Sequence, residues 1–337
     1  MTRAPFTDVC RLLRRVVRSA APCAFALAAS LAVVAAADTV ELVGGKEAKS
    51  ATRLSGEIVE IRAGQLTLRR ADGREDAYPL ARVARWDAAW PAGVDDARRH
   101  IREGRYAEAV EQLRAASGRE TRAWVKRALV ADAVVCFREL NQLQRAGELF
   151  ASLYQSDPQT PHLDVIPLAW TPVSDPSAAW LELAQRWLSQ DDAPALALLG
   201  ASWLIASGQP ERAQSVLQKL STSRDSRVAL LAEAQRWRSL GATAAESELE
   251  RWPKVVERLP TSLRAGPYYT LGRTLAQRGQ SELAVLMYLR VPIEYADQAR
   301  LAAESLEAAA AELDRLQRAD EAQRLRRERT ARFAFVP

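Results

Sequence analysis

Hydrophobic positions follow two different periods along this 337-residue chain. Between residues 38 and 88, apolar residues alternate with polar ones in short runs, which is the period of strands. Pairs such as Ala63-Gly64 and Asp72-Gly73 separate the runs and favour hairpin turns, because glycine accepts a positive φ. The pattern predicts five strands, over Thr39–Val43, Leu54–Ile61, Gln65–Arg70, Arg74–Pro79 and Arg82–Trp86.

Five short strands with tight turns predict a small all-β, barrel-like module over residues 38–88. The run from Gly56 to Leu68 is similar to small SH3-like or Sm-like barrels, with its apolar and turn positions at Ile58, Ile61, Gly64 and Leu66. The resemblance implies no particular activity, because such barrels serve many functions. We expect a structural cap on the following helices, with binding of a partner strand at the sheet edge as the alternative.

From Trp90 onward the period is helical, and one motif recurs. A small or polar turn precedes a helix with alanine near its fourth residue and a bulky apolar residue four positions later, replaced by Arg326 in the last copy. The intervals between the alanines are 37, 67, 71 and 38 residues, so the two long intervals each fit a further unit, near Trp180 and between Val228 and Pro260. We therefore predict six or seven helical hairpins, aligned on Ala109, Ala146, Ala213, Ala284 and Ala322.

The best copy of this motif resembles the tetratricopeptide repeat (TPR) family. Tyr268 takes the family's opening aromatic position, Leu271-Gly272 its Leu-Gly pair, and Ala284 its small residue where paired helices touch. The resemblance implies a mainly α fold, an α-hairpin solenoid whose first helices line a concave groove; Sel1-like arrays are the near alternative. By the family pattern, the groove-facing, partner-binding positions are Arg98, Arg102, Arg138, Tyr269, Arg273 and Gln277.

Five prolines interrupt the helical period in residues 157–178. Proline removes backbone donors, so this stretch is expected to be non-helical. It is also apolar, with Val165, Ile166, Leu168 and Trp170, and this predicts an ordered connector rather than a flexible linker. The hairpins then divide into residues 89–156 and 179–332. A capping helix ends the second group, and its charged run Arg324–Arg329 is either a solvated cap or a site for an anionic partner.

The N-terminal residues 1–37 have the layout of a secretory signal peptide. A basic segment precedes an uncharged apolar stretch, and Ala35-Ala36-Ala37 forms a small-residue cleavage site. We therefore expect export to the periplasm or cell envelope, or secretion, with no stable membrane span after cleavage. An uncleaved anchor is the alternative.

Net charge argues against nucleic-acid binding. The chain carries a formal charge of +5, but residues 1–37 contribute +4 of it, which leaves a nearly neutral body. Cys136 is the one cysteine after residue 37, and the two histidines, His100 and His162, are not at metal-ligand spacing. Neither a metal nor a cofactor is expected. No set of nucleophile, base and orienting group can be assembled, so the chain is not expected to be an enzyme.

These features together predict a non-enzymatic, exported scaffold that binds a partner protein or peptide in a TPR-like groove. Arginines at the groove positions could hold an acidic or C-terminal segment through charge-assisted hydrogen bonds. One alternative is an architectural or assembly factor of a cell-envelope complex. A second is an envelope enzyme acting on glycan or peptide, which would need a deep polar pocket. The pattern indicates no particular oligomeric state.

Overall fold

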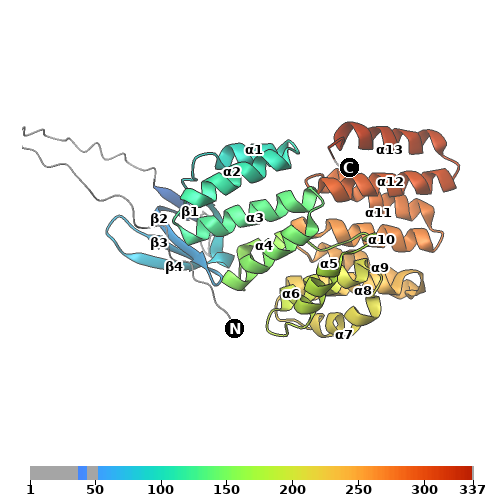
Figure 1. Cartoon of the computed structure of the whole chain (residues 1–337), viewed down its shortest axis with the longest axis horizontal. Coiled ribbons are helices and arrows are strands. Elements are labelled where there is room, and N and C mark those ends of the chain that lie inside the picture. Colours follow the sequence, from blue (N-terminus) through green and yellow to red (C-terminus); the bar gives the residue numbers. More distant parts are fainter. Residues whose placement is uncertain (1–36, 44–51, 336–337) are drawn as a thin grey trace, which may run out of the picture. The chain divides into compact units, whose positions relative to one another are not determined.

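The structure is a computed structural model, and it describes residues 37–43 and 52–335. These residues belong to one compact unit that spans residues 36–337. The predicted signal peptide lies outside the described residues except for Ala37. In the described part the chain is mainly α-helical, with one small antiparallel sheet near its N-terminal end (Figure 1).

Five strands form the sheet in the order β4-β3-β2-β1-β5, and every neighbouring pair is antiparallel. The predicted barrel is wrong: β4 and β5 lie at opposite edges and do not pair, so the sheet stays open. The strands are β1 (Asp38–Leu42), β2 (Thr52–Arg62), β3 (Gln65–Arg69), β4 (Glu75–Pro79) and β5 (Val83–Asp87).

The long strand β2 explains why the sheet bends without closing. Its first half pairs with β1 and its second half with β3, and the register shifts between Ile58 and Glu60. Such a bulge bends the strand and strengthens its twist. The bend brings Ile58, Leu66 and Leu68 together as fully buried residues, and the helices that follow cover them.

Thirteen α-helices follow the sheet in the described part of the chain. In five pairs, a three-residue turn with a positive φ at its middle residue joins two helices that are antiparallel neighbours (Figure 1). These pairs are α1 (Val94–Arg102) with α2 (Tyr106–Arg119), α3 (Ala123–Glu139) with α4 (Leu143–Ser156), α6 (Pro194–Ala206) with α7 (Pro210–Leu220), α10 (Ala265–Gln277) with α11 (Ser281–Glu294), and α12 (Ala299–Arg315) with α13 (Ala319–Arg332). Helix α5 (Ala178–Leu188) packs on α6, and a short 3-10 turn joins α8 (Ser226–Leu240) to α9 (Glu246–Glu257).

The five short turns share one backbone geometry. The middle residue of each has a positive φ between 59° and 75°, which reverses the chain at the end of the first helix. Five residues later, at the fourth residue of the second helix, stands one of the five alanines that the sequence pattern aligns, and each of them is fully buried. A methyl side chain at this position lets the paired helices approach closely. The turn residues are Gly104, Asn141, Gly208, Gly279 and Gln317.

The sheet and the first helices share one hydrophobic core. Val40 and Leu66 of the sheet belong to the same buried cluster as Ala109 of α2 and Trp124 of α3. The indole Nε1 of Trp124 donates a hydrogen bond to the backbone oxygen of Ile58, at 3.0 Å. A second cluster extends from α3 to α13. The sheet is therefore fixed to the first hairpins.

The proline-rich connector between α4 and α5 is well packed. It contains a 3-10 helix (Pro161–Val165) and no α-helix. Leu163, Ile166 and Leu168 are buried in the second cluster, and Val165 and Trp170 are half-buried against it.

Among the described residues, no helix combines the length and the apolar character that crossing a bilayer requires.

Candidate partner-binding site

Helix α6 holds residues 167–173 of the connector, which have no regular secondary structure. Ser202 binds Ala169 twice: its Oγ accepts from the backbone N–H at 3.0 Å and donates to the backbone oxygen at 3.1 Å. Nearby, Nε1 of Trp203 donates to the backbone oxygen of Pro167, at 3.1 Å. These bonds satisfy backbone groups of a buried segment that has no secondary structure of its own.

The same segment continues across α8, α10 and α12. Arg238 of α8 donates from Nη1 to the backbone oxygen of Ala169, at 2.6 Å. The indole of Trp170 lies against Gly266 of α10, and Thr171 lines a pocket with residues of α12. We call the surface that α3, α6, α8, α10 and α12 present to residues 166–173 the inner face. Four of these helices, α3, α6, α10 and α12, are the first of a pair, and α8 precedes α9.

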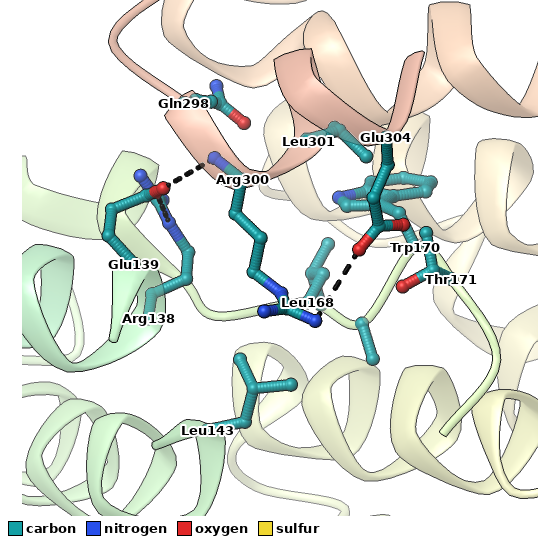
Figure 2. Close-up of a pocket in the computed structure, with 11 residues that line it drawn as sticks. Arg138, Glu139, Leu143, Leu168, Trp170, Thr171, Gln298, Arg300, Leu301 and Glu304 are labelled. Carbon is teal, nitrogen blue, oxygen red and sulfur yellow. Dashed lines mark hydrogen bonds and ion pairs between the residues drawn. The ribbon is translucent and has the colours of Figure 1, made fainter. Parts of the chain in front are cut away.

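Figure 2 shows a small pocket on the inner face between α3 and α12, with a volume of about 60 Å³. Glu139 of α3 is buried and accepts two hydrogen bonds, from Nε of Arg138 and from the backbone N–H of Arg300, each at 2.9 Å. Arg300 is the second residue of α12, so the Glu139 carboxylate meets the positive end of that helix. The contact joins residues 161 positions apart in the chain and fixes the two helices together.

A second acid faces the same pocket. Oε1 of Glu304 lies 3.5 Å from Nη2 of Arg300, and the side chain points toward Trp170 and Thr171 (Figure 2). Burial raises the pKa of the Glu304 carboxyl, against the opposing effects of Arg300 and Thr171. The pocket thus holds an arginine between two carboxylates, and its volume admits only a few water molecules or one small group.

A larger pocket of about 610 Å³ adjoins the first, and Arg138 and Gln298 line both. Its volume lies in the range of pockets that hold a small ligand or a peptide side chain. Phe335 packs on one rim against Gly104 and the ring of Tyr106, with the two ring centroids 5.9 Å apart. The charged side chains around this pocket are mixed in sign: Arg102, Glu103, Arg138, Asp164, Asp297 and Arg332.

The predicted residues of α1 and α3 differ in how free their charges are. Arg98 pairs with Asp132 at 3.0 Å and stacks over the ring of Trp90, so its guanidinium already has partners in the fold. Arg102 is exposed at the larger pocket, and Arg138 lies between both pockets. The structure therefore brings Arg102 and Arg138 together and places Arg98 elsewhere, in a separate hollow beside the sheet.

The predicted residues of α10 line neither of these pockets. The ring of Tyr269 packs against Tyr288, with centroids 5.5 Å apart, and burial raises the pKa of its hydroxyl to about 12. Tyr269 therefore stays protonated at neutral pH and can donate a hydrogen bond. Arg273 is half-buried and has no ion pair or hydrogen bond with any described residue. Gln277 is exposed at the end of the helix.

The sequence does not indicate that several residues of the inner face belong to the site. Glu139 and Arg300 meet across a separation that no local pattern records. Arg238 lies in an irregular unit where the recurring turn motif is missing. The sequence therefore could not show on which side of its helix Arg238 lies. The apolar composition of the connector predicts burial of Trp170, but it does not indicate which helices receive the side chain.

Burial shifts the pKa values of Cys136 and His162. Cys136 is buried, and burial raises the pKa of its thiol to about 12, which keeps the thiol protonated. Burial lowers the pKa of His162. Within residues 37–43 and 52–335, no group of three or more His, Cys, Asp or Glu side chains is placed to hold a metal ion.

Comparison of the chain with models of known protein families finds no match, and comparison with curated proteins finds none either.

Proposed function

We propose that this protein is an exported, non-enzymatic scaffold whose inner face binds an extended segment of a partner protein. The observation that carries the proposal is the connector itself. A segment without regular secondary structure lies against α6 and α8, and Ser202, Trp203 and Arg238 hold it through its backbone atoms. Backbone contacts of this kind suit an extended peptide of varied sequence, with pockets supplying selectivity.

The recurring hairpin geometry supports the finer assignment to TPR-like repeats. Five hairpins share the positive-φ turn residue and the buried alanine. A Cβ added to Gly272 would lie 2.8 Å from the ring of Tyr288, which is the close approach that the Leu-Gly pair of the family implies. TPR-like hairpins stack into a solenoid whose first helices line a groove, and in this proposal the connector occupies part of it.

Charge suggests what kind of partner segment would bind. Arg102 and Arg138 stand at the larger pocket, Arg138 already paired with Glu139, and Arg273 stands on α10 without an ion pair or hydrogen bond to a described residue. Arginine binds carboxylates through strong, directional hydrogen bonds. We therefore propose that the partner segment is acidic or ends in a free carboxylate.

A quantitative pull-down tests this proposal. The tagged protein is crosslinked in its native envelope, and partner recovery is compared for wild type, Arg102→Glu and Arg273→Glu. Arg114→Glu is the matched control, because Arg114 is exposed on α2 and forms no hydrogen bond or ion pair with a described residue. We expect both groove variants to lose the partner and the control to keep it. Equal recovery from all four proteins would reject the groove.

Export is the second part of the proposal, and it rests on the layout of residues 1–37. N-terminal sequencing of the protein purified from its producing cell tests it. A mature chain that starts at Asp38 is the expected result. A chain that still begins at its first residues would contradict cleavage and favour a retained anchor.

An architectural role is the second candidate, and α11 favours it. Leu283, Leu286 and Ile293 are exposed large apolar residues on this one helix, with Ile293 72% exposed. Apolar groups gathered on a surface commonly mark an interaction site. Light scattering separates the two roles: a stable oligomer that Leu286→Glu dissociates favours assembly, and a monomer with a peptide ligand favours the scaffold.

A further inference from the structure

Arg238 is a cation without an acid. Its Nη1 donates to three oxygens, the backbone oxygens of Ala169 and Ser202 and the side-chain Oε1 of Gln235, at 2.6, 3.3 and 2.8 Å. All three acceptors are neutral. No carboxylate among the described residues forms an ion pair with Arg238, although most buried charges in proteins are paired.

Two donors around this guanidinium are also left without acceptors. Nε of Arg238 is buried and has no partner, and the same is true of Nε2 of the fully buried Gln235. Buried polar atoms without a hydrogen-bond partner are rare in native proteins, and a bound water or ion commonly supplies the partner. Nη2 of Arg238 donates to no described residue, and the side chain as a whole is partly exposed. The guanidinium is thus anchored at one nitrogen and has free donors at the others.

A second arginine without an ion pair to a described residue stands on α10, and α10 packs against α8. Arg273 of α10 has no partner in the fold, and its charge helps to lower the pKa of Arg238, for which burial is the larger cause. The hydroxyl of Tyr269, one turn before Arg273 on α10, forms no hydrogen bond with a described residue. Burial raises the pKa of this hydroxyl, the Glu304 carboxylate raises it further, and the charges of Arg273 and Arg238 oppose them. Two like charges held together in a poorly solvated place repel each other unless an anion lies between them.

We propose that Arg238, Arg273 and Tyr269 form a receptor for an oxyanion, a carboxylate or phosphoryl group, on the inner face beside Ala169. The two guanidinium groups are charged and can only donate hydrogen bonds, and the protonated hydroxyl of Tyr269 can donate a third. An oxyanion there would satisfy the free guanidinium edges and remove the repulsion between the arginines. The proposal rests on the use of the inner face for ligand binding, and it names the chemical group that the face recognises.

The test uses the full mature chain and two small anions, pyrophosphate and succinate. Binding is followed by thermal unfolding and by isothermal titration, with sodium chloride at matched ionic strength as the blank. We expect at least one anion to stabilise the wild type beyond the blank. Arg273→Gln should weaken that binding at least about tenfold, since a charge-assisted hydrogen bond is lost, and Tyr269→Phe should weaken it by a smaller factor.

Arg273→Gln is the informative variant because it removes the charge, keeps part of the aliphatic stem and breaks no hydrogen bond or ion pair with a described residue. Arg114→Gln is its control and should bind like wild type. A response to pyrophosphate alone assigns the site to phosphoryl groups, and a response to succinate alone assigns it to carboxylates. Equal responses of wild type and Arg273→Gln, or no response to either anion, would overturn the receptor.

The anion-binding experiment and the pull-down can reject the receptor and the scaffold independently of each other. Loss of partner recovery in Arg273→Glu without binding of either small anion leaves the scaffold standing and removes the receptor. Anion binding that depends on Arg273, without any partner captured, leaves the receptor standing and removes the scaffold.

Discussion

The indole of Trp170 fills the space where a side chain on Gly266 would stand. A Cβ built on Gly266 would lie 1.9 Å from Cε2 of Trp170, far inside any contact distance. A residue of the connector and a residue at the start of α10 are therefore fitted to each other. This fit fixes the connector on the inner face.

Replacing Gly266 by alanine should destabilise the protein. The added methyl group forces Trp170 away from α10, and overpacking of this kind costs about 1–3 kcal/mol. Denaturant unfolding of Gly266→Ala measures the loss. Gly118→Ala is the matched control on α2, because nothing lies within 4 Å of its added Cβ. Alanine there should stabilise the helix by up to about 1 kcal/mol. Equal effects of the two substitutions would contradict the fit.

The contact between Glu139 and the start of α12 should be a large contributor to stability. Glu139→Gln removes a buried negative charge that binds Arg138 and the backbone N–H of Arg300. We expect the free energy of unfolding to fall by about 2–4 kcal/mol. For comparison, Glu328→Gln breaks an exposed pair with Arg332 and should cost less than about 1 kcal/mol. A small effect at Glu139 would mean that α3 and α12 are not joined in this way.

Acid should weaken the junction before α3. The side chain of Glu120 accepts hydrogen bonds from Arg122 and from the backbone N–H of Thr121, and together they lower its pKa to about 2 against the opposing effect of burial. A lowered folded-state pKa means that this stabilisation is complete above pH 4.5 and is lost as pH falls toward 2.

Glu120→Gln should therefore be less stable than wild type at pH 7, and the difference should narrow as pH falls from 4.5 to 3. Chemical unfolding at a series of pH values measures this difference. Glu250→Gln, on the exposed side of α9, controls for the loss of a surface charge. A difference that stays constant with pH would show that Glu120 is not held as described.

Local sequence signals predict the repeating part of this fold. The alanines at 109, 146, 213, 284 and 322 could be aligned because the turn and the helix start lie within a few residues of them. Each proves to be the buried fourth residue of a second helix. Such local rules act through φ preference and close helix packing, both of which a short stretch of sequence records.

Contacts over long separations could not be predicted. The sheet would close only if β4 paired with β5, and the alternating pattern of the strands does not show whether they pair. The bulge in β2 and the packing of the sheet on Trp124 determine that they do not. Among the candidate site residues, the repeat pattern predicts that both Arg98 and Arg102 face the groove. Only the fold shows that Asp132 and Trp90 already engage Arg98, while Arg102 faces a pocket.

Photocrosslinking from two positions tests the use of the inner face most directly. A photoreactive amino acid replaces Gln277, at the exposed end of α10, or Leu286, on the exposed side of α11. After irradiation in the native envelope, adducts are identified by mass spectrometry. We predict a partner adduct from Gln277 that the Arg273→Glu substitution abolishes, and none from Leu286. Adducts formed only from Leu286 would contradict the account and favour assembly through α11.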